Sequence, residues 1–382
     1  MRAWANLYPW DVNGDPAAAD RIAGLGLTGV ALAAAYHSVR AVTRFHPEHR
    51  IVTRDAAVYY RADIARWRAT GLRPARLQPT VARPAGSFER AATALRSRGL
   101  QVAAWAVITH NDRLGAAVPS AAVRNAFGDR YPWALCPASP AVREYAAALA
   151  GEIAALPEAD AIELEACGWY GVEHLSAHDK TAGAAAGAQA QWLLSVCFCA
   201  ACRGEYAAAG ADPAWLAACV RTAVGASPGD GSGQAQLPAA AARVLRGVRA
   251  AAATRFQREV IAAARAPGKP VYLHAHPDPR AMGANPGYEP AALAGATGIV
   301  LSCWDPRAAP SLVSRAAESA PPGTVIAASL LVVAGLGGDP ATLPAQAAAV
   351  GAAGATELRL YHAGLAAAPD LAAIGALCTT GA

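Results

Sequence analysis

The sequence has little that would suit a nucleic acid or a membrane as partner. Lysine is scarce, and 33 Lys and Arg residues against 28 Asp and Glu give a formal net charge of +5 without a basic run. Because no basic stripe alternates with aromatic residues, we expect no nucleic-acid partner. No stretch of about 18 apolar residues runs without Gly, Pro or charge, so we expect no membrane span.

Signals of secretion are missing as well. Residues 1–10 hold no apolar core followed by a small-residue cleavage site, as a signal peptide would. Eight cysteines in 382 residues do not suggest a disulfide scaffold, and their clustering favours metal ligation in a reducing compartment. We therefore predict a cytoplasmic protein. Its oligomeric state stays open, with a homo-oligomer among the options.

Apolar strands alternate with helices along the chain. The predicted strands are 3–8, 29–33, 101–108, 160–165, 269–274, 298–302, 324–333 and 357–361, and the clearest helices are 17–25, 88–98, 140–156, 215–224 and 239–264. This alternation is typical of an α/β protein with a (β/α)8 TIM barrel. An open doubly wound sheet is the alternative, but no glycine-rich phosphate loop follows the first strand.

We expect one barrel domain over residues 1–382 with two long insertions. The first, 37–86, follows the second strand and contains a predicted hairpin strand at 56–60. The second, 166–237, follows the fourth strand and includes a Gly- and Ser-rich loop. Insertions of this length in a compact domain are usually functional.

Polar and aromatic residues gather where the predicted strands end. In a TIM barrel these ends converge on one mouth, where catalysis takes place. Loops at the opposite face are mostly Ala, Gly, Pro and Arg, which favours a real site at the mouth. The candidate substrate-binding residues are Trp10, Asp11, Tyr36, His37, His110, Glu163, Trp169, His174, His274, His276, Trp304 and His362.

Two carboxylates end the fourth predicted strand. Glu163 and Glu165 have the same parity, so both side chains point to one side of the strand. Because burial beneath the helices would leave two charges unpaired, we expect both to face the barrel interior. Glu165 lies nearer the mouth and is the candidate catalytic residue. Glu163, one layer lower, is expected to bond Arg359 or a histidine.

Glycoside hydrolysis needs a second carboxyl group beside the scissile bond. Asp305, after the sixth strand, is the candidate because the preceding Trp304 offers an aromatic face to a sugar. Asp11 and Asp112 are the alternatives. Pro306 follows Asp305, so a plain turn-forming role for this residue also stays open.

His274 and His276 lie on one face of the fifth strand. They would hydrogen-bond sugar hydroxyls, or with Glu165 they would supply three ligands for a catalytic metal. The second interpretation makes the protein a metal-dependent lyase, isomerase or hydrolase. A further hypothesis is a barrel that binds a sugar without catalysis.

The most specific motif is Cys197-x-Cys199-x-x-Cys202. Thiolates bind Zn²⁺ tetrahedrally, so a fourth ligand is needed. We expect Cys136 in this place, because the loops after strands three and four are neighbours in a barrel. Cys167 and Cys219 are the alternatives. Four thiolates leave no open coordination position, so the zinc would be structural.

These residues resemble the family 42 glycoside hydrolases, the β-galactosidases, and uncharacterised glycosyl-hydrolase-like barrels. In family 42 a cysteine and a Cys-x-Cys-x-x-Cys cluster bind a structural zinc beside the fourth barrel strand. The similarity covers roughly residues 130–205. The family's nucleophilic Glu on strand seven has no counterpart here, where only Ser329 is polar, and Leu164 replaces the Asn before the acid. The resemblance implies a zinc-bearing glycosidase acting on a carbohydrate or glycosylated small molecule, without transfer of the retaining mechanism.

Overall fold

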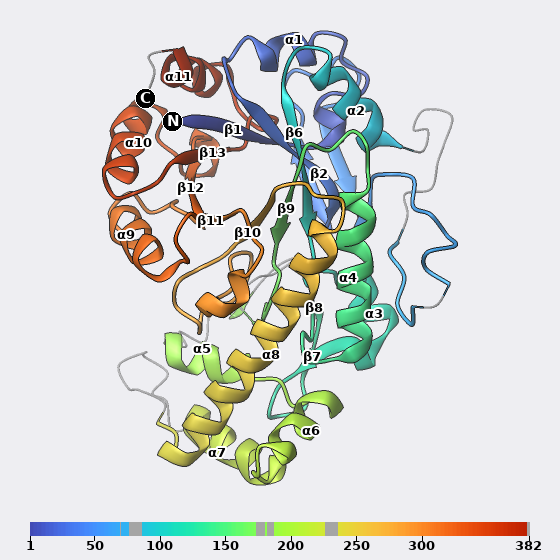
Figure 1. Cartoon of the computed structure of the whole chain (residues 1–382), viewed down its shortest axis with the longest axis vertical. Helices are drawn as coiled ribbons and strands as arrows, with labels where there is room; N and C mark the ends of the chain where they lie inside the picture. The colour runs from blue at the N-terminus through green and yellow to red at the C-terminus, as the bar shows by residue number, and fades with distance from the viewer. Residues whose placement is uncertain (69, 76–85, 173–179, 182–186, 226–235, 380–382) are drawn as a thin grey trace.

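Eight parallel strands close into a barrel in the computed structural model, which describes residues 1–68, 70–75, 86–172, 180–181, 187–225 and 236–379 (Figure 1). Each strand pairs with the next along the chain, and the first pairs with the last to close the sheet. The predicted TIM barrel is therefore confirmed, with all eight strands within a few residues of their expected places. They are β1 (Arg2–Leu7), β2 (Gly29–Tyr36), β6 (Gln101–Val107), β9 (Ala161–Glu165), β10 (Val271–His274), β11 (Gly298–Ser302), β12 (Val325–Leu331) and β13 (Glu357–Tyr361).

Helices surround the barrel and bury their alanine- and leucine-rich faces against it. The long α8 lies beside α4, and small residues along both helices let them approach closely (Figure 1). The surrounding helices are α1 (Ala18–Ala23), α2 (Ser87–Arg96), α4 (Pro140–Ala154), α8 (Ala239–Arg265), α9 (Ala309–Ser319), α10 (Leu343–Ala352) and α11 (Ala368–Thr379). In the described parts of the chain, no helix combines the length and apolar character needed to cross a bilayer.

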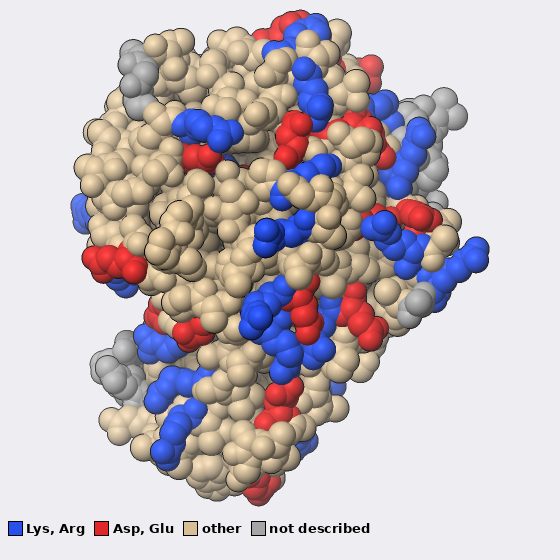
Figure 2. Space-filling view, in the orientation of Figure 1, with Lys and Arg blue, Asp and Glu red and all other residues tan. Residues whose placement is uncertain are grey.

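Basic and acidic side chains lie side by side over the α4 and α8 ridge (Figure 2). Arg143 on α4 pairs with Glu259 on α8 at 2.9 Å, and Arg255 on α8 pairs with Glu205 at 2.7 Å. All four side chains are partly exposed, so these pairs contribute little to stability.

The barrel interior changes from apolar to polar along its axis. A tight apolar layer fills the amino-terminal end, while charged and hydroxyl-bearing side chains occupy the middle and the carboxyl-terminal end. Inward-facing residues at alternate positions along parallel strands build such layers. The apolar layer consists of Trp4, Ala103, Ala161, Tyr272, Val300 and Ala327.

The insertion after β2 carries a small hairpin, β3 (Val39–Val42) and β4 (Ile51–Arg54), and then β5 (Ala57–Val58). β5 pairs antiparallel with β2, which agrees with the predicted strand at 56–60. Glu152 on α4 fixes the later part of the insertion. Its carboxylate accepts hydrogen bonds from Tyr60 Oη at 2.6 Å and Trp67 Nε1 at 2.8 Å.

A second group of elements packs beyond α4 and α8 at one end of the molecule (Figure 1). It contains the hairpin β7 (Ala122–Arg124) and β8 (Arg130–Leu135), with α3 (Asp112–Ala117) beside it. After β9 it continues with α5 (Ala188–Leu194), α6 (Ala200–Ala208) and α7 (Pro213–Gly225). The β7–β8 hairpin and helices α5 and α6 were not predicted from the sequence.

Candidate active site and cysteine cluster

A cavity of about 700 Å³ opens at the carboxyl-terminal ends of the strands. Its floor contains Asn6 from β1, Trp105 from β6 and Glu165 from β9, and β10 adds His274. Glu165 is the only carboxylate that lines this cavity among the residues the structure describes. Glu165 is therefore the candidate carboxyl acid or base of the described cavity, beside the histidines and tyrosines that also line it.

Beneath the cavity floor lies a buried charge network. Glu163 is fully buried, accepts a hydrogen bond from Arg359 Nε through Oε1, and has Oε2 3.2 Å from His274 Nε2. Arg359 also donates to Glu357 at 3.0 Å. Burial alone would raise the pKa of Glu163, but the charges and hydrogen bonds of Arg359 and His274 outweigh it and lower the pKa to about 2. Glu163 is thus an ionised structural carboxylate.

Glu165 has the opposite environment. Burial raises the pKa of its carboxyl group, and the charge of Glu163 acts in the same direction. His274 and a 2.7 Å hydrogen bond from Trp105 Nε1 to Oε2 oppose the shift without cancelling it. Two carboxyl groups two residues apart on β9 thus have pKa values pushed apart, which is the pattern of acid–base sites.

Three tyrosines form one wall above Glu165. Tyr8 Oη donates to Tyr36 Oη at 3.2 Å, and Tyr361 lines the same wall. Tyr36 reaches it because the β2–β6 register shifts between Ala33 and Ala35, which reverses the side of the sheet to which later side chains point. Burial raises the pKa of each of the three hydroxyls, so all stay protonated as hydrogen-bond donors at neutral pH.

Five of the predicted residues line the cavity: Tyr36, His37, Glu165, His274 and Trp304. The strand pattern did not single out several others, because an aromatic residue or Asn inside an apolar strand resembles core packing. Asn6 is one of them: it is buried and lines the cavity, and its Oδ1 has no hydrogen-bond partner among the described residues. The other unpredicted residues include Tyr8, Trp105, Asn285, Ser302 and Tyr361.

Three other predicted residues stack on aromatic rings that line the cavity. His110 stacks on His37 with ring centroids 4.3 Å apart, and Trp10 and His362 each stack on Tyr8 at 4.4 Å. Burial lowers the pKa of His362 to about 3, so its ring is neutral. None of these three is among the cavity-lining residues.

Asp11 and Trp169 lie outside the cavity lining. Asp11 is half-buried and accepts a hydrogen bond from Tyr8 N at 2.7 Å, and desolvation of its carboxyl group raises its pKa to about 7. Trp169 donates from Nε1 to the carbonyl of Arg249 at 3.0 Å. His174 lies outside the described residues.

The structure does not bring Asp305 to the cavity lining. Its side chain is exposed, and Oδ1 accepts a hydrogen bond from the backbone N–H of Arg307 at 2.9 Å. Asp112, the alternative second carboxylate, likewise bonds to a neighbouring loop: both of its carboxylate oxygens lie within hydrogen-bond distance of Ser38 Oγ, which donates to them. The assignment of Asp305 as second carboxylate stays a prediction.

The predicted His274, His276 and Glu165 metal ligands do not converge in the described structure. His274 Nε2 is bonded to Glu163, and His276 Nδ1 accepts from the backbone N–H of Asp278 at 3.0 Å. His276 is also absent from the cavity lining. Within the described ranges, potential metal ligands gather in groups of three or more only at four cysteines.

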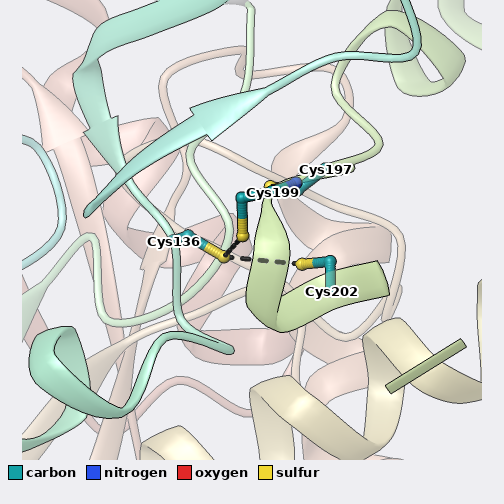
Figure 3. A group of neighbouring side chains, drawn as sticks. All are labelled: Cys136, Cys197, Cys199 and Cys202. Atoms are coloured by element: carbon teal, nitrogen blue, oxygen red, sulfur yellow. Dashed lines mark hydrogen bonds between the residues drawn. The ribbon is translucent and has the colours of Figure 1, made fainter. Parts of the chain in front are cut away.

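Cys136, Cys197, Cys199 and Cys202 point toward one another, and all four are buried (Figure 3). Their sulfur atoms lie within 4.8 Å of one another, with Cys136 Sγ 3.5 Å from Cys202 Sγ and 3.6 Å from Cys199 Sγ. A Zn–S bond of about 2.3 Å gives sulfur separations of about 3.8 Å in a tetrahedron. The cluster therefore has the donors and spacing to bind a metal ion.

Positive groups surround the cluster. Backbone N–H groups of Arg124 and Cys199 donate to Cys197 Sγ at 3.5 and 3.4 Å, and α6 begins directly after Cys199. Hydrogen bonds among the thiols, that of Cys136 first, hold the pKa of Cys199 well below its usual range and raise those of Cys136 and Cys202, so one thiolate is favoured without a metal. The buried Arg249, which lies over the Trp169 ring at 4.3 Å, adds a positive charge to this environment. These groups stabilise thiolates, the form that binds metals.

No protein-family model matches the chain, and no curated protein is similar in sequence. Three solved structures with similar folds come from glycoside hydrolases. The PgaB (BpsB) glycoside hydrolase domain from Bordetella bronchiseptica has 15% identity and a TM-score of 0.60 over 99% of both chains. α-L-Fucosidase isoenzyme 2 from Paenibacillus thiaminolyticus has 12% identity and a TM-score of 0.58 over 100% of this chain and 49% of its own.

The third is Gan42B, a GH42 β-galactosidase from G. stearothermophilus, with 12% identity and a TM-score of 0.52 over 100% of this chain and 56% of its own. The chain therefore spans about half the length of the fucosidase and of this galactosidase, and nearly all of the PgaB domain. At these identities the likeness establishes the fold: a (β/α)8 barrel of the kind found in glycoside hydrolases.

Proposed function

We propose that this protein is a glycoside hydrolase in which Glu165 donates a proton to the glycosidic oxygen. The observation that carries the proposal is the carboxyl group of Glu165, buried at the floor of the 700 Å³ cavity with its pKa raised. A carboxyl group whose pKa is raised keeps its proton to higher pH than a free one, as suits the proton donor in glycosidic bond cleavage.

The neighbours of Glu165 suit this role. Trp105 donates to Oε2, which leaves Oε1 as the oxygen that carries the proton toward the cavity. Asn6 and the tyrosine wall offer an acceptor and several hydroxyl donors to the hydroxyl groups of a sugar. Trp304, which contacts Tyr361 at 4.8 Å between ring centroids, offers an aromatic face at the mouth.

The direct test first screens wild type on a panel of p-nitrophenyl glycosides for the preferred sugar. It then compares wild type, Glu165→Gln and Glu318→Gln on the methyl glycoside of that sugar, because an alkoxide needs a proton donor to leave and p-nitrophenolate does not. Glu318 is exposed on α9 and serves as the matched control. We expect Glu165→Gln to lower kcat/KM at least about 100-fold, the usual size of a general-acid contribution, and Glu318→Gln to leave it unchanged. Full activity in Glu165→Gln would refute the role of Glu165, and turnover of no glycoside would refute hydrolysis.

The second carboxylate needs its own variant. Asp305→Asn on the best substrate of the panel tests the sequence prediction directly. A loss comparable to that of Glu165→Gln assigns Asp305 to the reaction, and near-wild-type turnover restricts it to its hydrogen bond with Arg307.

We also propose that the four cysteines hold a structural Zn²⁺. Four thiolate ligands would complete a tetrahedral shell and leave no position for substrate, so the ion would stabilise the fold without taking part in the reaction. It would join the end of β8, through Cys136, to the start of α6, through Cys199 and Cys202. Those two segments lie about 60 residues apart in the chain.

A further inference from the structure

Large apolar side chains line the mouth of the cavity, in contrast to its polar floor, and the exposed Arg40 on β3 is the charged residue that lines it with them. Val42 on the β3–β4 hairpin, Trp304 after β11 and Leu336 at the end of the turn Ala334–Leu336 all line it. Their exposed fractions are 52%, 45% and 52%, which places them among the few large hydrophobic residues left exposed in the described structure.

These three residues come from three separate strand-to-helix connections, after β2, β11 and β12. Their gathering at one opening is not a consequence of local sequence. Met282 and Leu365, both half-buried, extend the same lining. Apolar surface that is gathered and left in water is unfavourable for the free protein and marks a place where a ligand binds.

The side chains at the mouth indicate the chemistry of that ligand. Val42, Met282 and Leu336 have no hydrogen-bonding group that selects hydroxyls, so they do not suit a second sugar ring. They suit an alkyl or aryl group, which gains free energy on leaving water. The hydroxyl-rich part of the substrate then occupies the floor next to Glu165.

We infer that the substrate is an amphipathic glycoside whose aglycone is an apolar group of several carbons held by Val42, Trp304 and Leu336. This inference rests on the proposed hydrolase function for its orientation, with the glycosidic oxygen at Glu165 and the aglycone toward solvent. A free oligosaccharide would leave the apolar mouth uncovered.

The kinetic test compares methyl, octyl and 2-phenylethyl glycosides of the sugar that the p-nitrophenyl panel identifies, below micelle-forming concentrations. Each fully buried methylene is worth about fourfold, so partial burial of the chain predicts an octyl glycoside at least about tenfold better in kcat/KM than the methyl glycoside. The 2-phenylethyl arm distinguishes an aryl from an alkyl preference, because its leaving group is an alkoxide like those of the other two. Equal kcat/KM for all three would overturn the inference and leave the hydrolase proposal intact.

The matched variants are Leu336→Ser at the mouth and Ile64→Ser, which removes a residue that is 54% exposed outside the cavity lining. We expect Leu336→Ser to reduce the octyl-to-methyl ratio of kcat/KM about three- to tenfold. Ile64→Ser should leave the ratio unchanged. An equal effect of both variants would assign the preference to nonspecific amphiphile binding and overturn the inference.

A binding arm separates failure of the inference from failure of the proposed function. Calorimetry measures octyl and methyl glycosides of six common monosaccharides with wild type and Leu336→Ser. Suppose that no glycoside is hydrolysed, but wild type binds octyl glycosides more tightly than methyl glycosides and Leu336→Ser does not. The apolar site is then supported and the hydrolase proposal is refuted. If no octyl glycoside binds more tightly than its methyl counterpart, the apolar site falls.

Discussion

Replacing Glu163 with Gln removes the negative charge from the buried network beneath the active site. Arg359, which is 1% exposed, keeps Glu357 as its remaining ion-pair partner. Lowering the pKa of Glu163 from 4.5 to about 2 corresponds to about 3 kcal/mol of stability at neutral pH. Removing one partner of a buried ion pair typically costs about 3–5 kcal/mol. The pKa shift and this typical cost therefore both predict a loss of about 3 kcal/mol.

Thermal unfolding followed by circular dichroism measures this loss. At about 2.1 cal/mol/K per residue, a chain of 382 residues has an unfolding entropy of about 0.8 kcal/mol/K. The Tm of Glu163→Gln should therefore fall by about 4 °C at pH 7. Glu205→Gln is the control, because its pair with Arg255 is 34% exposed on both sides and should change Tm by only about 1 °C. Equal shifts in the two variants would refute the assignment of a strong buried pair.

The same variant has two pH-dependent consequences. Because Glu163 has a lower pKa in the folded than in the unfolded chain, its stabilisation is present above about pH 4.5 and disappears as the pH falls toward 2. The Tm difference from wild type should therefore shrink between pH 7 and pH 3. The charge of Glu163 also raises the pKa of Glu165, so the alkaline limb of kcat/KM should move to lower pH in Glu163→Gln.

Three further predictions concern the cluster, the acid and the insertion. Cys197→Ser should lose bound zinc, measured by elemental analysis, and several degrees of Tm, whereas Cys219→Ser, outside the cluster, should keep one zinc per chain. Burial raises the pKa of Glu165, so ionisation of this residue opposes folding at pH values above its unfolded-state pKa. Glu165→Gln should therefore raise Tm at pH 7 and leave it unchanged at pH 3. An unchanged Tm at pH 7 would contradict this. Glu152→Ala removes the carboxylate that accepts hydrogen bonds from Tyr60 and Trp67, and it should speed proteolysis within residues 37–86. Cleavage at the wild-type rate would show that other contacts hold the insertion in place.

The sequence was sufficient to predict the barrel because each strand is a mostly apolar segment followed by a polar or aromatic end, even where charged residues interrupt it, as in β9 and β13. The parity of Glu163 and Glu165 was equally readable, since alternate strand positions share a side. Tyr36 shows the limit of that reasoning. Its place in the cavity wall depends on the irregular register between Ala33 and Ala35, which cannot be predicted from the residues of the strand.

Asp305 illustrates a different limit. Its position just after β11 favoured a place at the mouth, but the loop beyond it is set by local bonding to the Arg307 N–H. Side-chain direction in a turn depends on a few backbone angles that strand patterns do not encode. The cysteine motif was more reliable, because Cys136, Cys197, Cys199 and Cys202 must meet at one point for metal binding, and the structure brings them together.

The two glutamates of β9 are best understood as one unit with divided roles. Glu163 is ionised because Arg359 neutralises it, so the barrel interior tolerates a buried carboxylate directly beneath the cavity. Burial first, and that fixed negative charge in addition, make ionisation of Glu165 less favourable and raise its pKa. The i, i+2 spacing is what couples them, because both side chains face the interior and lie one layer apart. A single Glu at position 165 would lose this electrostatic contribution to its raised pKa.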